Sequence, residues 1–374
     1  MLLAIDGYEA NAVSRVGIGR YAFELIDRIA KRQQSGSSPF TEVIVYLPEE
    51  KRSHMPAEST SFHYRVVGPK PFWTFLGFPL ALMLASRKAD VVFSPTHYLP
   101  RWVSVPRVIA VMDVSYLSYP ELFKTSDLHK LVNWTAFSVA HAARVITISE
   151  FSKRAIIEAY HVPEDRVVVA YPALTEWQAK HTMGTSKKTL STPKRYILTV
   201  GTLQPRKNFA RLIEAFSQLS DHSLDLVIVG KKGWLYEGIL EAPKIYGVED
   251  RVKFMDFVAD DELPALYKNA ACFVLPSLYE GFGLPVLEAM SYGIPVVVSN
   301  ISSLPEIAGE AGIYINPEDT KSITKGIAEA LSESGPAKAK RIAAGRKRVA
   351  LFTWDKAADT VIDVLAGVGG KGTP

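Results

Sequence analysis

The feature that most constrains the fold is a repeated alternation of short apolar runs with helical segments. In the first half, periodic spacing of apolar residues favours helices over 21–32, 128–143 and 150–160, and Ser149 is a suitable N-cap for the last of them. Apolar strands that alternate with helices are typical of a parallel sheet with helices on both faces. The apolar runs expected to form its strands are Leu2–Ile5, Val43–Leu47, His63–Val67, Val91–Ser94, Arg107–Val111, Val145–Ile148 and Val167–Val169.

The alternation stops at one polar segment and then restarts. Residues 180–194 are rich in Ser, Thr and Lys, which is typical of a linker, and a chain of 374 residues suits two or three domains. We therefore expect an α/β protein of two Rossmann-like, doubly wound domains, residues 1–180 and 190–352, with a ligand cleft between them and a last helix near 354–366. The segments expected to form the second domain are the strands Tyr196–Val200, Leu226–Val229, Val252–Met255, Cys272–Leu275 and Pro295–Ser299 and the helices Phe209–Leu219, Asp261–Asn269 and Leu284–Tyr292.

Composition excludes several classes of protein. The single cysteine, Cys272, cannot form an internal disulfide, and a net charge of +4 is small for a dedicated nucleic-acid binder. The eight histidines show no metal-ligand spacing. No basic region precedes the first apolar residues, so we expect no signal peptide and a cytoplasmic protein.

The longest apolar run, Phe72–Ala85, is interrupted by Pro79. It is shorter than a membrane-spanning helix, which needs about 18 to 20 residues. We expect a core helix here. The alternative is an interfacial segment that brings the protein into peripheral contact with an anionic membrane, at the inner face of the cell membrane.

The strongest local signal is the segment 280–288, Glu-Gly-Phe-Gly-Leu-Pro-Val-Leu-Glu, between an apolar strand and a helix. Its glycines allow close backbone approach, and the amides at a helix N-terminus attract anions. Glu280 precedes the turn and Glu288 follows inside the helix, so the pair could reach two ends of one ligand, such as two sets of sugar hydroxyls. The alternative is a carboxylate at a helix N-terminus and a solvated helix face.

A second signal is the segment 201–208, Gly-Thr-Leu-Gln-Pro-Arg-Lys-Asn, directly after the strand 196–200. Open α/β sheets bind ligands at the carboxyl ends of their strands. Arg206 and Lys207 could therefore hold a diphosphate by charge-assisted hydrogen bonds. The alternative is a loop with two solvated cations.

Two weaker signals lie in the first half. Gly17 and Gly19 form a G-x-G turn that lacks the P-loop ending and the third glycine of the dinucleotide fingerprint, so we interpret it as a tight turn that permits close approach. Asp113 follows an apolar strand and would face the expected cleft, unless it caps the next segment.

Taken together, these segments resemble the retaining glycosyltransferases of family four, which have the GT-B architecture of two Rossmann-like domains. The E-x7-E frame of Glu280 and Glu288, the 201–208 loop, Gly230-Lys231-Lys232-Gly233-Trp234 and Ser303-Leu304-Pro305-Glu306 occur in the expected order. The resemblance covers nearly the whole chain.

The resemblance implies a nucleotide-sugar donor bound mainly by the second domain, without a metal or other cofactor. Arg206 and Lys207 would neutralise the diphosphate in place of a divalent metal. Glu280 would hold the donor-sugar hydroxyls as a positioning group, and Glu288 would bind the ribose. The helix 354–366 would pack back on the first domain.

The backbone also has roles by this resemblance. The segment of Phe282, Gly283 and Leu284 would help Glu280, and the backbone near Phe257 and Val258 would receive the base. In the 201–208 loop, Gly201 would contribute to the donor site.

The first domain would supply the acceptor side. Gly17 and Gly19 would let a loop of the first domain close over the donor. Asp113 would be one of the catalytic residues and would face the sugar or the acceptor. Many members carry His-Asp where this chain has Met112-Asp113, and methionine cannot hydrogen-bond a sugar as imidazole does. Either Asp113 carries that role alone, the local register differs, or the sugar is unusual.

The resemblance favours GDP-mannose over UDP-glucose as the donor. It implies transfer of a hexose to a glycan or a polyprenyl-diphosphate-linked acceptor in cell-surface polysaccharide synthesis, with no nucleic-acid partner. Two alternatives stay open. One is a sugar-nucleotide epimerase of the same fold, and the other is a non-catalytic nucleotide-sugar sensor or assembly subunit.

Overall fold

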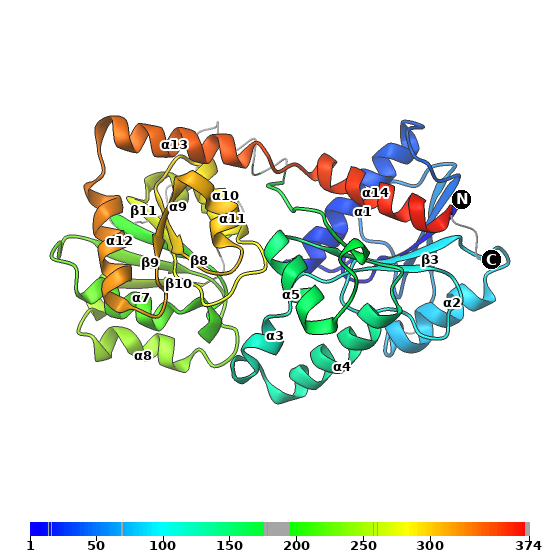
Figure 1. Ribbon diagram of the computed structural model, residues 1–374, viewed down its shortest axis with the longest axis horizontal. Coiled ribbons are helices and arrows are strands. Elements are labelled where there is room, and N and C mark those ends of the chain that lie inside the picture. Colours follow the sequence, from blue (N-terminus) through cyan, green and yellow to red (C-terminus); the bar gives the residue numbers. More distant parts are fainter. Residues whose placement is uncertain are drawn as a thin grey trace. The chain divides into compact units, whose positions relative to one another are not determined.

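The computed structural model describes residues 1–13, 15, 17–68, 70–175, 178, 195–256, 258–259 and 261–370. The chain divides into two compact units (Figure 1). The first comprises Met1–Leu117, Thr125–Pro172 and Thr353–Pro374, and the second comprises Ser118–Lys124 and Ala173–Phe352. The expected linker at 180–194 lies outside the described residues.

The first unit contains a parallel sheet, which within the described residues has seven strands in the order β3-β2-β1-β4-β5-β6-β7. The first strand, β1, pairs with β2 on one side and with β4 on the other, so the strand order reverses between β1 and β4. In an open α/β sheet such a reversal is where ligands bind. The strands are β1 (Leu2–Asp6), β2 (Glu42–Leu47), β3 (Phe62–Val66), β4 (Val91–Ser94), β5 (Arg107–Ala110), β6 (Arg144–Thr147) and β7 (Val167–Val169).

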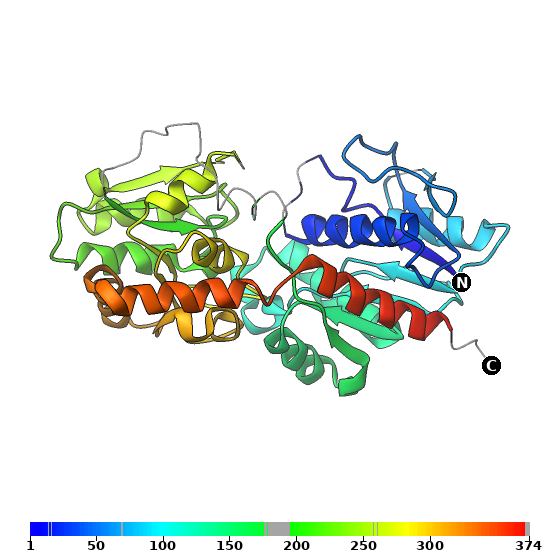
Figure 2. The same ribbon diagram turned by 90° about the horizontal axis from the view of Figure 1, so that it is seen from above.

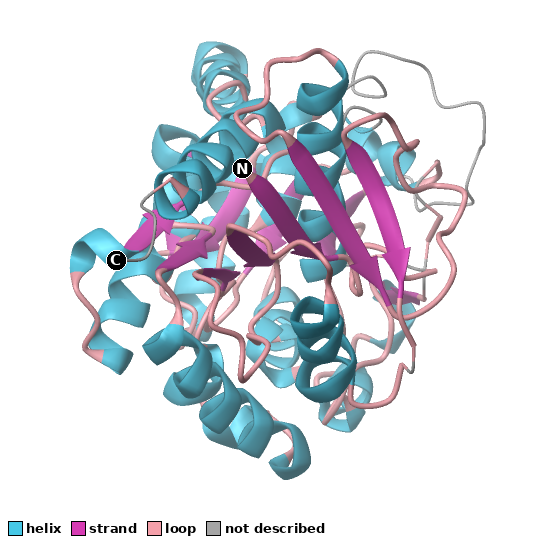
Figure 3. Cartoon of the chain, turned by 90° about the vertical axis from the view of Figure 1, so that its right-hand side faces the viewer, coloured by secondary structure: helices cyan, strands magenta, loops and turns pink. Residues whose placement is uncertain are grey.

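Helices cover this sheet on both faces (Figure 3). The C-terminal helix α14 lies beside α1 (Figure 2), where Arg32 forms an ion pair of 2.8 Å with Asp359 and the rings of Tyr21 and Trp354 are 5.7 Å apart. The helical segments are α1 (Ile18–Gln34), the π-helical turn η1 (Trp73–Gly77), α2 (Phe78–Leu84), α3 (Ser115–Ser118), α4 (Thr125–His141), α5 (Glu150–Tyr160), η3 (Glu164–Arg166) and α14 (Trp354–Gly369).

The second unit contains a parallel sheet with the same local arrangement. Within the described residues its six strands are ordered β10-β9-β8-β11-β12-β13, so the order reverses between β8 and β11. Its core joins apolar residues of β8, β9 and β11 to those of α7, α8 and α12. The strands are β8 (Tyr196–Val200), β9 (Asp225–Val229), β10 (Val252–Met255), β11 (Cys272–Leu275), β12 (Val296–Ser299) and β13 (Gly312–Ile315).

The helical segments of the second unit alternate with these strands. One short turn, η2 (Pro120–Leu122), comes from the segment that interrupts the first unit. The others are η4 (Pro205–Lys207), α7 (Phe209–Ser217), α8 (Glu237–Ile245), η5 (Glu249–Arg251), α9 (Leu263–Asn269), α10 (Leu284–Ser291), α11 (Leu304–Ala308), η6 (Gly309–Ala311), α12 (Thr320–Ser332) and α13 (Gly335–Val349).

The predicted fold class is confirmed, and the differences from the predicted elements have local causes. The helix expected from Asp261 begins at Leu263, because Pro264 favours the first turn of a helix. Strand β13 was not predicted, because it is short and begins with a glycine, a residue that is depleted in strands. Ser149 caps α5 as predicted by accepting a hydrogen bond from the Ser152 amide.

Candidate active site

The two strongest sequence signals meet at the strand reversal of the second sheet. The loop 201–208 follows β8, and the segment 276–283 follows β11. These two strands are neighbours in the sheet and run parallel, so both loops leave from the same edge. Two segments that are about 70 residues apart in the sequence therefore form one site, in the place that the topology of the sheet provides.

Backbone contacts hold the two loops together. The Arg206 carbonyl accepts a hydrogen bond of 2.9 Å from the Leu278 amide. Asn208 adopts a left-handed conformation, with φ at 60°, and its side-chain amide donates to the carbonyls of Pro276 at 3.0 Å and Pro317 at 2.7 Å. Asparagine tolerates this conformation better than most residues. The 3-10 turn η4 is thereby fixed with its two cations beside the Glu280 loop.

Side chains complete the contact between the loops. Lys207 Nζ lies 2.6 Å from Glu280 Oε1, and Arg206 Nη1 lies 3.5 Å from Glu280 Oε2. The Ser277 hydroxyl donates to Glu280 Oε1 at 2.7 Å, and the Arg206 guanidinium also donates to the Tyr279 carbonyl. Lys207 and Glu280 are both buried, with 8% and 6% of their surface exposed. This cation–carboxylate cluster consists of Arg206, Lys207 and Glu280.

The cluster controls the ionisation of Glu280. Burial alone would raise the pKa of this carboxyl, but the charges of Lys207 and Arg206 and the hydrogen bonds from Lys207 and Ser277 outweigh it and hold the pKa below its usual value. Glu280 is therefore a carboxylate at neutral pH and can only accept hydrogen bonds. Two cations face this single carboxylate, which leaves positive charge at the site.

The turn between Glu280 and α10 depends on glycine. Gly283 has φ at 106°, and a Cβ atom there would lie 2.8 Å from Leu304 Cδ2, so a side chain would be strained and crowded. The Ser303 hydroxyl lies 2.9 Å from the Glu280 carbonyl and 2.8 Å from the Phe282 carbonyl. These two contacts of the hydroxyl stabilise the turn. Helix α10 begins directly after the turn, at Leu284.

Glu288 lies inside α10 and is held from two sides. The Tyr267 hydroxyl donates to Glu288 Oε2 at 2.6 Å, and the Gln178 side-chain amide donates to Oε1 at 2.6 Å. Only 8% of Glu288 is exposed. Its carboxylate therefore has a fixed position in a small cavity that Leu263 also lines.

Gly201 fits the role of a close-contact residue. A Cβ atom on Gly201 would lie 3.3 Å from Lys207 Cε, so the lysine side chain passes directly over this glycine. The neighbouring loop is also packed tightly here, because a Cβ on Gly230 would lie 1.9 Å from the Gly201 carbonyl oxygen.

The structure brings Arg206, Lys207, Glu280 and Gly201 together and places Glu288 inside α10, the helix that follows the Glu280 turn. The alternative of solvated side chains is wrong for Lys207 and Glu288, because both are buried and paired. Of the expected base-binding pair, Val258 is half-buried and Phe257 lies outside the described residues.

Three predicted site residues belong to the first unit. Gly17 precedes α1 with φ at 47°, and a Cβ on Gly19 would lie 3.0 Å from the Glu9 carbonyl oxygen, so a tight turn is present. Asp113 is half-buried after β5, and its Oδ1 accepts a hydrogen bond of 2.9 Å from the Ser115 amide at the start of α3. This local bond is the one that the capping alternative predicts.

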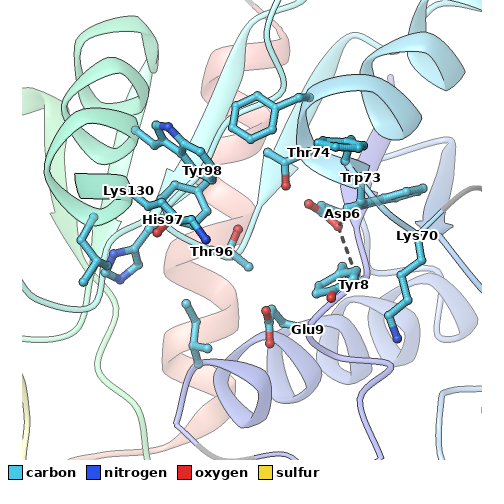
Figure 4. Close-up of a pocket in the computed structure, with 15 residues that line it drawn as sticks. Asp6, Tyr8, Glu9, Lys70, Trp73, Thr74, Thr96, His97, Tyr98 and Lys130 are labelled. Carbon is cyan, nitrogen blue, oxygen red and sulfur yellow. Dashed lines mark hydrogen bonds between the residues drawn. The ribbon is translucent and has the colours of Figure 1, made fainter. Parts of the chain in front are cut away.

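Sequence reasoning missed a cavity in the first unit, at the reversal between β1 and β4. It has a volume of about 570 Å³. The side chains at the end of β1 and in η1 face those that follow β4 across it (Figure 4). The signal available in the sequence was Asp6, an acid at the end of an otherwise apolar strand. The labelled lining residues are Asp6, Tyr8, Glu9, Lys70, Trp73, Thr74, Thr96, His97, Tyr98 and Lys130.

Among the described residues, no group of three or more His, Cys, Asp or Glu side chains is arranged to hold a metal ion. None of the helices in this part of the chain has both the length and the apolar character that a membrane crossing requires.

Comparison with known proteins identifies the family. The model described as Glycosyltransferase Family 4 matches residues 16–175, and the model described as Glycosyl transferases group 1 matches residues 185–348. O-antigen chain mannosyltransferase B of Escherichia coli is 28% identical over 363 residues, which cover 93% of this chain and 95% of that protein.

Two further likenesses agree with this. The serotype-specific mannosyltransferase WbdA of Escherichia coli is 33% identical over 261 residues, which cover 66% of this chain and 31% of WbdA. The structure of sucrose-phosphate synthase from Thermosynechococcus elongatus superposes with a TM-score of 0.73, at 18% identity over 99% of both chains, and is alike in fold. The chain belongs to the glycosyltransferases of family 4, and its fold is GT-B.

Proposed function

We propose that the cation–carboxylate cluster binds a nucleotide-sugar donor and that the enzyme transfers its hexose with retention of configuration. The observation that carries this proposal is the buried contact of Lys207 and Arg206 with Glu280 at the strand reversal of the second sheet. A diphosphate leaving group gains negative charge in the transition state, and fixed cations stabilise that charge. The cations need no metal ion to do so.

We assign the individual groups roles that suit this geometry. Arg206 and Lys207 bind the diphosphate, while the carboxylate of Glu280 accepts hydrogen bonds from donor-sugar hydroxyls. The backbone of Phe282, Gly283 and Leu284 lines the same turn and contacts the sugar.

Further roles fall to residues outside the cluster. Glu288 binds the ribose hydroxyls, and the backbone at Val258 receives the base. The roles expected for Gly17, Gly19 and Asp113 stay predictions for the first unit.

The reaction itself needs no covalent intermediate on the protein. The acceptor hydroxyl oxygen bonds to the anomeric carbon on the face from which the diphosphate leaves, and the carbon–oxygen bond to the phosphate breaks. The hydroxyl proton passes to the leaving diphosphate. Glu280 is in this account a positioning group rather than a nucleophile, because both cations already engage its carboxylate.

We propose mannose as the hexose and a cell-surface polysaccharide as the product. The support is the likeness over nearly its whole length to a protein named O-antigen chain mannosyltransferase B. GDP-mannose is accordingly the favoured donor, ahead of UDP-glucose, and the acceptor is a glycan or a polyprenyl-diphosphate-linked glycan.

To test the proposed transfer, the purified protein is incubated with GDP-mannose or with UDP-glucose, each in the presence and in the absence of a mannose-terminated oligosaccharide. Transfer from GDP-mannose with the α-linkage retained supports the proposal. Conversion of the donor to an epimer without any acceptor favours the epimerase alternative. Donor binding without turnover across acceptors favours the sensor or assembly subunit.

We also propose that the segment η1–α2 contacts an anionic membrane surface, where a lipid-linked acceptor would be presented. One face of this segment is buried through Trp73 and Phe78, whereas Leu76, Leu80 and Leu84 on the other face are 47%, 48% and 82% exposed. The exposed cations Arg87 and Lys88 follow it. Exposed apolar side chains beside cations are typical of interfacial binding.

The membrane proposal is tested by sedimentation with vesicles of anionic and of neutral lipid at low salt. Binding to the anionic vesicles, lost in Leu80→Ser/Leu84→Ser, supports it. Failure to bind anionic vesicles contradicts it without affecting the proposed transfer reaction.

A further inference from the structure

Glu288 differs from Glu280 in the kind of group that holds its carboxylate. The Glu280 carboxylate faces two cations. Glu288 instead accepts hydrogen bonds from two uncharged donors, the Tyr267 hydroxyl at 2.6 Å to Oε2 and the Gln178 side-chain amide at 2.6 Å to Oε1. One such donor on each oxygen fixes the plane of the carboxylate without cancelling its charge. Hydrogen bonds to a charged acceptor are stronger than those between neutral groups.

The first donor, Tyr267, has a fixed position in α9. It is buried, and its ring stacks on the ring of Tyr292, with 5.4 Å between the centroids and 10° between the planes. The ring of Phe273 in β11 lies 5.8 Å away. Burial and the charge of Glu288 raise the pKa of the Tyr267 hydroxyl well above its usual value, so the hydroxyl keeps its proton and remains a donor.

The second donor, the Gln178 amide, is oriented by a local motif. Thr175 and Gln178 match the T-x-x-Q pattern of a capping box. The side-chain oxygen of Gln178 accepts hydrogen bonds from the Thr175 backbone amide at 2.9 Å and from its hydroxyl at 3.1 Å, and the Gln178 backbone amide donates to that hydroxyl at 3.2 Å. Because the oxygen faces Thr175, the NH₂ group is the part of the side chain that faces Glu288.

The surroundings of Glu288 make its hydrogen bonds selective. Leu263 and Pro264 at the start of α9 and Tyr292 after α10 line the same small cavity as the carboxylate, so apolar atoms lie beside it. In such surroundings a hydrogen bond is stronger than in water, and a missing one is costly. A ligand is therefore selected by how well its hydroxyls match the position of this carboxylate.

Two oxygens held in one plane suit two hydroxyls on adjacent carbon atoms. Ribose, the proposed ligand of Glu288, has such a pair at C2′ and C3′, and a deoxyribonucleotide lacks the hydroxyl at C2′. A mobile carboxylate could turn toward the one hydroxyl that remains, whereas a fixed carboxylate cannot. A site built to hydrogen-bond a hydroxyl rejects the analogue that lacks it.

We propose that Tyr267 and Gln178 are positioning residues that hold the Glu288 carboxylate for a ribose diol. They thereby give the enzyme its preference for ribonucleoside diphosphate sugars over deoxyribonucleoside diphosphate sugars. The inference rests on the proposed transfer function and names the nucleotide class of the donor. Both residues act through Glu288 rather than on the reacting bond.

The test measures the binding of GDP and of 2′-deoxy-GDP to the full chain by calorimetry, and of UDP and 2′-deoxy-UDP if uridine is the preferred base. Tyr267→Phe removes the hydroxyl and keeps the ring. Gln178→Glu keeps the oxygen that faces Thr175, because glutamate also completes a capping box, but it replaces the donor to Glu288 by an acceptor.

The matched control is Tyr196→Phe. This change also removes the hydroxyl of a buried tyrosine, but that hydroxyl donates to the Leu266 carbonyl in α9, at 2.8 Å. Thermal unfolding measures the stability of each variant. The ratio of the two affinities does not depend on the fraction of the protein that is folded, so it separates positioning from stability.

We expect the wild type to bind 2′-deoxy-GDP about tenfold more weakly than GDP, the effect of one lost hydrogen bond to a charged group. In Tyr267→Phe and in Gln178→Glu the difference should shrink to about threefold or less, because GDP binding weakens while 2′-deoxy-GDP binding changes little. Tyr196→Phe should keep the wild-type ratio.

Equal binding of GDP and 2′-deoxy-GDP by the wild type would overturn the proposal, and so would a wild-type ratio in Tyr267→Phe or Gln178→Glu, even with lowered stability. Tighter binding of GDP by Gln178→Glu would also overturn it, because Gln178 would then compete with the ribose. Failure of the wild type to bind GDP and UDP would instead contradict the proposed function, so the two failures are distinguishable.

Discussion

In each of the two sheets the strand order reverses at one place within the described residues. The two places are equivalent in topology, but the residues beside them differ in their chemistry. In the second unit, the loops after β8 and β11 are joined by a buried cluster of two cations and a carboxylate. In the first unit, the ends of β1 and β4 border a cavity with aromatic walls and two carboxylates, and His97 beside it has a buried ring nitrogen with no hydrogen-bond partner among the described residues. The topology thus determines where a ligand binds, and the residue types at that edge determine which ligand it is.

The comparison also distinguishes two uses of a carboxylate. The pKa of Glu280 lies below its usual value because cations outweigh the effect of burial. The pKa of Asp6 is raised to about 6, because burial outweighs its hydrogen bonds from Trp73 and Tyr8 and Glu9 adds to the rise. The first carboxylate lies between two cations and stays ionised, whereas burial makes the second take up a proton more readily than an ordinary aspartate.

The largest effect is expected at Glu280. Glu280→Gln should lower transfer by about a thousandfold, since it weakens the sugar contact and releases both cations from their fixed positions. Assays with GDP-mannose and acceptor measure this loss, and Glu318→Gln on an exposed loop is the control. Glu280→Ala should abolish transfer too, but it leaves the buried Lys207 unpaired, so only the Gln variant separates activity from stability. Near-normal transfer by Glu280→Gln would contradict the assignment.

The next effect is expected at Lys207. Lys207→Met keeps much of the side-chain volume and removes the charge, so transfer should fall by about a hundredfold and donor affinity should fall with it. The exposed Lys325→Met serves as the control. A change in the acceptor KM without a change in donor affinity would contradict the assignment of donor binding to the strand reversal of the second sheet.

A smaller effect, on stability, is expected at the turn before α10. Gly283→Ala should lower the free energy of unfolding by about 1–3 kcal/mol, because alanine is strained at φ 106°. Gly238→Ala in α8, where a Cβ meets nothing within 4 Å, should be neutral or stabilising. Urea denaturation of both variants measures the difference, and equal effects would show that the turn does not need glycine.

The smallest effect is a pH dependence at the first strand reversal. Because burial favours the protonated form of Asp6 in the folded protein, the free energy of unfolding measured by urea denaturation should fall as pH rises from about 4 through about 6, where this pKa lies. Glu9 also has a raised pKa from burial, and the pKa of His97 is lowered by burial, although the charge of Asp113 opposes that shift. Asp6→Asn should remove the inflection, and its persistence in that variant would assign it to Glu9 or His97.

Much of the fold was predictable from the sequence, because strand and helix periodicity is a local signal. The strands Val91–Ser94, Tyr196–Val200 and Cys272–Leu275 begin and end where their apolar runs do. In the second unit, the residues singled out from the 201–208 and 280–288 motifs lie at one edge of the sheet.

What the sequence did not reveal depends on contacts over long distances in the chain. Lys207 meets Glu280 across 73 positions, and Trp73 meets Asp6 across 67. No local pattern marks the buried ring nitrogen of His97 that has no partner among the described residues, because the environment of this side chain comes from the Met112 backbone on a neighbouring segment. The cavity therefore became visible only when the ends of β1, η1 and β4 were placed together.

The most direct test of the account is a titration of the wild type, Lys207→Met and His97→Phe with GDP-mannose by calorimetry, in the absence of acceptor. We expect Lys207→Met to lose most of the donor affinity and His97→Phe to bind the donor as the wild type does. Wild-type affinity in Lys207→Met, or an equal loss in both variants, would contradict the claim that the donor is bound at the strand reversal of the second sheet.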